Sequence, residues 1–223
     1  MEKRYIKNLG TLTEEEQVVL FDSKVCVVGC GGLGGYIIEI LARLGVGHIT
    51  AVDGDVFDET NLNRQLFSEP ALMGVKKALA AEARVNRVNP DVKLLPVTEF
   101  FDEQNGEEIL NGHDLVIDAL DNVDSRLLLN DLCRKLNMVM IHGAIGNWFG
   151  QISVIRPEDN IMEALYESEL DLKKIGNPAF IPSVIAAMEV SECVKVLLNK
   201  GSTLAGKVLT VDLLENEFEI TEF

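Results

Sequence analysis

The stretch VCVVGCGGLGG, Val25 to Gly35, decides the fold of this chain. Its first part, Val25–Gly29, predicts a buried strand, and the glycines that follow predict a tight turn that opens a helix. The backbone N–H groups at the start of such a helix can bind a phosphate. Asp53 follows about twenty residues later in ITAVDGD, where an acidic side chain can accept a hydrogen bond from a ribose hydroxyl. The pattern predicts a nucleotide site and leaves NAD, FAD and ATP open.

Strands and helices alternate around this stretch, which predicts an α/β fold with a Rossmann-like, doubly wound and mostly parallel sheet. We expect strands at Val25–Gly29, His48–Val52, Val92–Val97, Leu115–Ala119 and Val139–His142. We expect helices at Leu33–Leu44, Val75–Val88, Glu103–Leu110, Ser125–Leu136 and Ile181–Asn199, the last facing the core.

The C-terminal third of the chain departs from this alternation. Gly150–Ile155 is a predicted strand with no helix before it, so we expect it to pair antiparallel with its predecessor. Lys207–Leu213 and Glu217–Thr221 predict a hairpin that adds antiparallel strands at one edge of the sheet. Pro157–Pro178 is irregular and charged.

At the other end, Thr11–Glu14 predicts the cap of a short helix that ends at about Leu20. No linker or repeat divides the sequence. We therefore predict a single domain over residues 1–223, with a helical leader at 1–22 and a crossover at 156–180.

Composition limits the classes of partner. The formal net charge of −16 opposes binding to nucleic acid, whose affinity for proteins comes mostly from neutralised phosphates. No stretch is long and apolar enough to span a bilayer, and the N-terminus has no apolar signal core. We expect a cytoplasmic protein that does not bind membranes, and the charge disfavours a nucleic-acid substrate unless a local basic patch contacts it.

The four cysteines are Cys26, Cys30, Cys133 and Cys193. None forms a CxxC pair, so the usual spacing of zinc ligands is missing. We expect at least three of the four to be small core residues. Cys30 lies in the glycine turn, and we expect it to be partly exposed.

The segment after Asp53 distinguishes a triphosphate such as ATP from a dinucleotide cofactor as the ligand. It reads DGDVFDETNLNRQ, and a dehydrogenase has no need for such an Asn-x-Asn-Arg-Gln cluster. An enzyme that acts on a triphosphate needs cations over the β- and γ-phosphates and a carboxylate for Mg²⁺. Arg64, Lys76 and Lys77 offer the cations. The alternatives without a role in binding are that Arg64 forms a surface ion pair and that the lysines lie on a solvated helix face.

The carboxylates are Asp118 and Asp121 in LVIDALDN, at the end of a predicted strand. In an open parallel sheet the carboxyl ends of the strands face the ligand crevice. Together with the cations, they predict a triphosphate site.

These motifs resemble those of the ThiF/MoeB/HesA superfamily, which is related to the ubiquitin-activating enzymes. The resemblance extends from about Arg4 to Phe223. The matching segments are GCGGLGG (29–35), VDGD (52–55), NLNRQ (61–65), GVKKALAAEARVNRVNP (74–90), DALDN (118–122) with Arg126, and HGAIGNWFGQ (142–151).

The resemblance implies an enzyme that uses ATP and Mg²⁺ to convert a carboxylate into an acyl adenylate, with release of pyrophosphate. In the sulfur-carrier branches, that carboxylate is the C-terminal glycine of a small ubiquitin-like protein that ends in Gly-Gly. By motif position, Asp53 would bind the ribose and Asp121 the Mg²⁺. The catalytic residues would be Arg64, Lys77 and Asp121. The full set implied to bind the nucleotide is Gly29, Gly31, Gly32, Gly34, Asp53, Asp55, Asn61, Arg64, Gln65, Lys77, Asp121 and Asn122, with Asn61, Arg64, Gln65 and Lys77 on the phosphates.

The chain departs from the family pattern in three ways. Family members often place an N-terminal arginine in the active site of the partner subunit of a homodimer; here Lys7 stands at the best-matching position, with Arg4 as the other candidate. The paired zinc CxxC motifs are absent. No cysteine lies in the crossover between Arg156 and Pro182, so adenylation is predicted without a covalent cysteine step.

Three alternatives remain open on sequence. One is adenylation of a carboxylate on a modified tRNA base, as in dehydratase-like relatives, which the acidic charge counts against. The second is a non-catalytic scaffold that binds a nucleotide and docks a partner. The third is a dehydrogenase that binds NAD.

Overall fold

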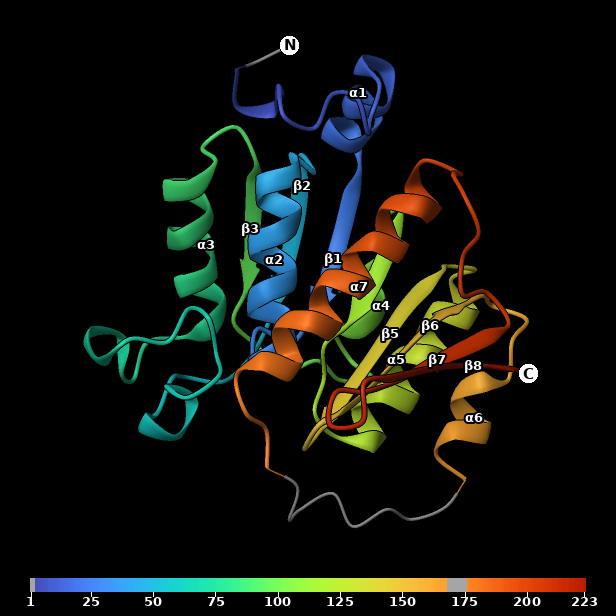
Figure 1. Cartoon of the computed structure of the whole chain (residues 1–223). Coiled ribbons are helices and arrows are strands. Elements are labelled where there is room, and N and C mark those ends of the chain that lie inside the picture. Colours follow the sequence, from blue (N-terminus) through green and yellow to red (C-terminus); the bar gives the residue numbers. More distant parts are fainter. Residues whose placement is uncertain (1–2, 168–175) are drawn as a thin grey trace.

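The computed structural model describes residues 3–167 and 176–223, and its strands form a single sheet in the order β3-β2-β1-β4-β5-β6-β7-β8 (Figure 1). Strands β1 to β5 run parallel, and β6, β7 and β8 pair antiparallel beyond them. The strands are β1 (Lys24–Val28), β2 (His48–Val52), β3 (Lys93–Val97), β4 (Leu115–Asp118), β5 (Met140–Gly146), β6 (Phe149–Ile155), β7 (Lys207–Asp212) and β8 (Glu217–Glu222). The predicted α/β class and the antiparallel C-terminal strands are confirmed.

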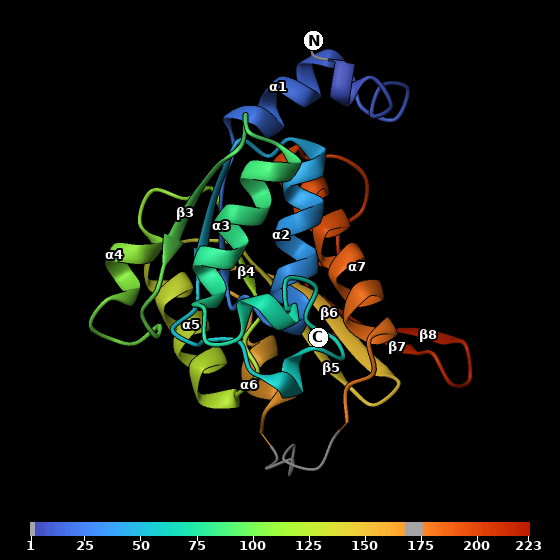
Figure 2. The same cartoon turned by 90° about the vertical axis from the view of Figure 1, so that its left-hand side faces the viewer.

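Helices cover both faces of the sheet, as a doubly wound fold requires. One face carries α2 (Gly32–Leu44), α3 (Lys77–Val88) and α7 (Phe180–Leu197). The other carries α4 (Gly106–Leu110), α5 (Val123–Lys135) and α6 (Ile161–Leu165). Figure 2 shows the two layers on either side of the sheet, with α1 (Glu14–Asp22) beyond one end of the strands.

Side-chain alternation along the strands builds two cores. Val25 and Val27 of β1 belong to the core under α2 and α7, whereas Cys26 and Val28 belong to the core under α5. This follows from the period of two in a strand, which sends successive side chains to opposite faces. The sheet order changes direction between β1 and its neighbours β2 and β4, and in such folds a ligand crevice lies at the carboxyl ends of those strands.

Most predicted boundaries lie within two residues of those observed, and the larger differences have local causes. Strand β5 extends four residues beyond the predicted His142, because β6 pairs with it along its whole length across a two-residue turn. Asn147 in that turn has a φ of 55°, as such hairpin turns require. Helix α6 lies inside the crossover that was predicted to be irregular.

Two caps also differ from the predictions. Thr13 and Glu16 form the capping box of α1, in place of the predicted cap at Thr11–Glu14. Helix α4 begins at Gly106 rather than at Glu103, because the Asp102 carboxylate accepts hydrogen bonds from the backbone of Gln104 and Asn105 and holds a turn there.

All four cysteines are buried. The expectation that Cys30 is partly exposed is wrong: its exposed fraction is 1%, because its side chain packs into the core under α2. No helix among residues 3–167 and 176–223 is long and apolar enough to cross a membrane.

Candidate active site

The glycine turn between β1 and α2 forms the floor of a pocket at the carboxyl ends of the strands. Gly29 has a φ of 104°, and a Cβ there would lie 2.4 Å from the Ala119 carbonyl oxygen. A Cβ on Gly34 would lie 1.8 Å from the Gly29 carbonyl oxygen. These two glycines therefore let α2 pack closely against the strands.

Gly31 and Gly32 also line the pocket. A Cβ on Gly32 would approach no atom closer than 3.8 Å, so no packing contact demands glycine there. Gly32 is the first residue of α2, and backbone N–H groups in the first turn of a helix lack intrahelical partners. Such a site favours an anion, and a bare backbone allows a phosphate to approach it.

Asp53 follows β2 and lines the same pocket. Its two carboxylate oxygens accept hydrogen bonds from the backbone N–H groups of Cys30 and Asp55, each at 2.8 Å. These bonds fix the orientation of the carboxylate beside the glycine turn. Each oxygen keeps a second lone pair, so the group can still accept a hydrogen bond from a ribose hydroxyl.

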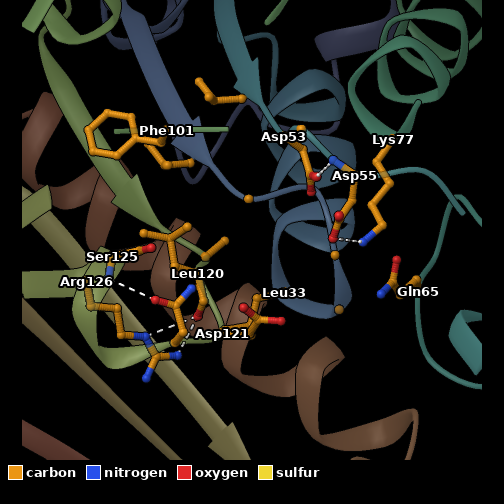
Figure 3. Close-up of a pocket in the computed structure, with 18 of the residues that line it drawn as sticks. Leu33, Asp53, Asp55, Gln65, Lys77, Phe101, Leu120, Asp121, Ser125 and Arg126 are labelled. Atoms are coloured by element: carbon orange, nitrogen blue, oxygen red, sulfur yellow. Dashed lines mark hydrogen bonds and ion pairs between the residues drawn. The ribbon is translucent and has the colours of Figure 1, made fainter. Parts of the chain in front are cut away.

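The structure distinguishes the two adjacent lysines. Lys77 lines the pocket, is 7% exposed, and places its Nζ 3.1 Å from Oδ2 of Asp55 (Figure 3). Lys76 lies outside the pocket lining, and its Nζ donates to the Gly54 carbonyl. Lys77 is therefore the cation that can meet a bound phosphate, and Asp55 holds it in place.

Arg64 also lines the pocket, and its Nη1 donates to the carbonyl of Thr60 at 3.0 Å and to Oδ1 of Asn63 at 2.9 Å. These bonds use one edge of the guanidinium. The group carries five N–H donors in all, so others stay available to a ligand.

Gln65 and Asn61 differ in their surroundings. Oε1 of Gln65, which lines the pocket, is buried without a hydrogen-bond partner in the described part of the chain. A buried polar atom of this kind is costly unless a ligand or water satisfies it. Asn61 is buried away from the pocket lining, and its Oδ1 accepts from the Asp58 backbone in a capping box. The geometry gives Asn61 a structural role in the loop, and a phosphate contact for it stays a prediction.

The opposite wall follows β4 and contains Asp121, Asn122 and Arg126. Figure 3 shows Asp121 and Arg126 across the pocket from Lys77 and Gln65. Asp121 is exposed to solvent, and Asn122 caps α5 by accepting from the Ser125 backbone at 2.9 Å. Each wall therefore carries both a carboxylate and a cation, with Asp121 and Arg126 on one side and Asp55 and Lys77 on the other.

Mg²⁺ is commonly bound by one or two carboxylates together with substrate phosphates and water. Asp121 fits that pattern as a single exposed carboxylate in the same pocket as the glycine turn. Within residues 3–167 and 176–223, no group of three or more His, Cys, Asp or Glu side chains could hold a metal by itself.

Several residues in and behind the pocket were given no role by the sequence analysis. The pocket includes Phe101 and Ser125, which lie outside every quoted motif, and Ile145, which lies in the HGAIGNWFGQ segment without a role assigned to it. Behind it, His142 and Tyr166 form hydrogen bonds that reach the Asp121 wall. His142 lies in the HGAIGNWFGQ segment, so the signal was present without a role to attach to it.

Cys30, the cysteine of the glycine turn, is poorly suited to act as a nucleophile. Burial raises the pKa of the Cys30 thiol well above its ordinary value, and the neighbouring Asp53 carboxylate acts in the same direction. The thiol is therefore protonated at neutral pH, and thiolates are the reactive form. Cys30 is also absent from the pocket lining.

The N-terminal segment lies at the far end of the sheet from the pocket (Figure 2). Arg4 forms an ion pair with Asp91 at 3.3 Å and donates to Asn89, so its own chain holds its side chain there. Lys7 is exposed. Neither residue lines the pocket.

Comparison with known proteins yields one family. The sequence profile described as "ThiF family" matches residues 3–223. The SAMP-activating enzyme E1 of Haloferax volcanii is 36% identical over 94% of this chain and 80% of its own length. The molybdopterin-synthase adenylyltransferase of Salmonella typhimurium is 32% identical over 92% of this chain and 84% of its own.

A sulfur carrier protein adenylyltransferase of Thermus thermophilus is 33% identical over 92% of this chain and 80% of its own length. Among solved structures, Escherichia coli MccB with ATP superposes with a TM-score of 0.85 at 20% identity, over 100% of this chain and 72% of that one. At that identity the superposition supports the fold alone.

Proposed function

This chain belongs to the ThiF family of adenylyltransferases, and we propose that it uses ATP and Mg²⁺ to adenylate the C-terminal glycine of a small ubiquitin-like sulfur carrier. The observation that carries the proposal is that Arg64, Lys77 and Asp121 line one pocket around the glycine turn. The three relatives named above are an activating enzyme and two adenylyltransferases, one of them named for a sulfur carrier protein.

The reaction joins a carboxylate oxygen of the carrier to the α-phosphorus of ATP and breaks the bond to pyrophosphate. Its main requirements are alignment of the two reactants and neutralisation of charge on the phosphates. In this pocket Gly31, Gly32 and Lys77 would hold the phosphates, and Arg64 would neutralise charge on the leaving pyrophosphate. Asp53 would orient the nucleotide through its ribose.

Asp121 would hold the Mg²⁺, which supplies positive charge to the phosphate oxygens when bound. The buried Oε1 of Gln65 would gain a partner when a hydroxyl or water enters. Rotation of that amide by about 180° would instead aim its Nε2 at a phosphate oxygen, because the two ends of an amide have similar shapes.

We further propose a homodimer, a closed two-fold assembly being the commonest oligomer. Lys7 would then reach the pocket of the partner subunit. It is the better of the two candidates, because the carboxylate of Asp91 and the side chain of Asn89 already hold Arg4.

Pyrophosphate exchange tests the proposal. The chain is incubated with ATP, Mg²⁺, labelled pyrophosphate and a carrier that ends in Gly-Gly, and incorporation of label into ATP is measured. We expect exchange that depends on the carrier, disappears with EDTA, and is lost in Arg64→Ala. A carrier shortened by its last glycine is the matched control. Intact ATP binding with no exchange for any Gly-Gly carrier would reject the carrier as substrate.

A further inference from the structure

A chain of buried hydrogen bonds lies behind the Asp121 wall of the pocket. Asp118 ends β4 and His142 lies opposite it on β5, and both are fully buried. Nδ1 of His142 lies 2.7 Å from Oδ2 of Asp118. Burial lowers the pKa of His142, so the ring is neutral at pH 7, with its proton on Nδ1 facing the carboxylate. Its Nε2 is then an acceptor.

Two donors reach that acceptor: Nε2 of Gln151 lies 3.1 Å from Nε2 of His142, and the Tyr166 hydroxyl lies 3.2 Å from it. The same hydroxyl accepts from Nη1 of Arg126 at 2.7 Å. The Arg126 guanidinium also lies over the Tyr166 ring, 5.7 Å from its centroid. Tyr166 therefore links the two residues through one hydroxyl, as donor to His142 and as acceptor from Arg126.

Both ends of this chain of bonds hold the peptide groups of Leu120. Oδ1 of Asp118 accepts from the Leu120 N–H at 3.0 Å. Nε and Nη2 of Arg126 donate to the Leu120 carbonyl at 3.1 and 2.5 Å, as Figure 3 shows. Leu120 directly precedes Asp121, so these bonds fix the backbone from which the Asp121 carboxylate projects into the pocket.

Tyr166 follows α6 directly and lies in the connection from β6 to α7, far from Asp121 in sequence. We propose that Tyr166 is a positioning residue: its hydroxyl couples the α6 end of this connection to the Leu120–Asp121 loop and so sets the affinity of the pocket for Mg²⁺. The inference rests on the proposed function, because it concerns the site that we assign to Mg²⁺ and ATP.

The physical reason is that the hydroxyl completes the hydrogen bonding of a buried cation. Arg126 is 5% exposed, and without the hydroxyl its Nη1 has no other partner in residues 3–167 and 176–223. The ion pair of Arg126 with Asp118, Nε to Oδ2 at 3.8 Å, stays in place, but the unpaired Nη1 favours a shift of the guanidinium toward water that weakens its bonds to the Leu120 carbonyl. Gln151 does not replace this contact, since its Nε2 is a donor and lies 3.1 Å from His142.

The test is Tyr166→Phe, which keeps the ring and removes only the hydroxyl. Thr50→Val is the matched control, because the Thr50 hydroxyl also lies against a histidine Nε2, that of His113 at 2.7 Å, outside the pocket lining. ATP binding is measured by calorimetry at a series of Mg²⁺ concentrations, together with thermal unfolding of both variants.

We expect Tyr166→Phe to raise the Mg²⁺ concentration for half-maximal ATP binding by about tenfold, the lower end of what loss of an outer contact to a metal ligand costs. Thr50→Val should leave it unchanged. Equal Mg²⁺ dependence of both variants would overturn the proposal and leave Tyr166 a structural residue. Absence of Mg²⁺-dependent ATP binding in the unaltered chain would overturn this proposal and the proposed function together. Normal binding without carrier-dependent exchange would reject only the carrier.

Discussion

Glu189 on α7 is fully buried, and Glu189→Gln tests what that burial does to stability. Neither carboxylate oxygen has a hydrogen-bond partner among the described residues. A Cβ on Gly143 of β5 would lie 2.3 Å from the carboxyl carbon, so the side chain packs directly on the β5 backbone. Burial raises the pKa of Glu189 well above its ordinary value, and Asp118 acts in the same direction, against a smaller opposing effect of Arg126.

The sign of the pH effect follows from proton binding. The unfolded chain releases this proton near its ordinary pKa of 4.5, whereas the native chain keeps it to higher pH. Between these two values the native state binds one more proton, so the free energy of unfolding falls by about 1.4 kcal/mol per pH unit as pH rises. From pH 5 to pH 7 this group lowers the free energy of unfolding by at most about 3 kcal/mol, a large part of the stability of an ordinary domain.

Urea unfolding at pH 5, 6 and 7, followed by circular dichroism, measures this slope. We expect the unfolding free energy of Glu189→Gln to fall less steeply with pH than that of the unaltered chain, because the amide does not titrate. Glu217→Gln on exposed β8 is the control for charge removal itself and should keep the original slope. Parallel lines for Glu189→Gln and the unaltered chain would refute the reasoning.

Three further predictions concern the pocket. Lys77→Met should lower the rate of pyrophosphate exchange by about 100-fold, because the phosphates lose one neutralising positive charge. Lys76→Met should lower that rate far less, and equal rates in the two variants would contradict the assignment of Lys77. Gly34→Ala should lower the melting temperature measured by calorimetry by about 10 °C, because the added Cβ has no room. Gly32→Ala should keep the normal melting temperature but bind ATP more weakly. Normal ATP binding by Gly32→Ala would show that no phosphate approaches this backbone. Asp121→Asn should raise the Mg²⁺ concentration for half-maximal exchange by at least about tenfold, and an unchanged requirement would place the metal elsewhere.

Much of the fold could be predicted because its signals are local. The period of apolar residues from Val25 onward, the glycine turn and the end of the helix at Leu44 each depend on neighbours within a few residues. The antiparallel β6 was predictable because no helix precedes it. The extent of β5 was not, since its last residues, Gly143–Gly146, are strand only through pairing with β6.

The sequence predicted most of the residues named for the site, but it did not predict which of them line the pocket. Both Lys76 and Lys77 stood at the right distance in sequence, and only the start of α3 decides which of them faces the pocket. Asn61 belongs to the same motif as Arg64, yet its amide caps a turn. These outcomes depend on where backbone directions place each side chain, and spacing along the chain does not specify that.

The sequence by itself determined that the chain adopts a doubly wound α/β fold with a glycine turn after its first strand, because strand periodicity and turn chemistry are encoded residue by residue. Only the tertiary structure decided that Cys30 is buried, that the Glu189 carboxylate has no hydrogen-bond partner among residues 3–167 and 176–223, and that the Tyr166 hydroxyl lies within hydrogen-bonding distance of His142 and Arg126. Burial and hydrogen bonding between distant segments depend on how helices pack across the sheet, and that packing exists only in the folded chain.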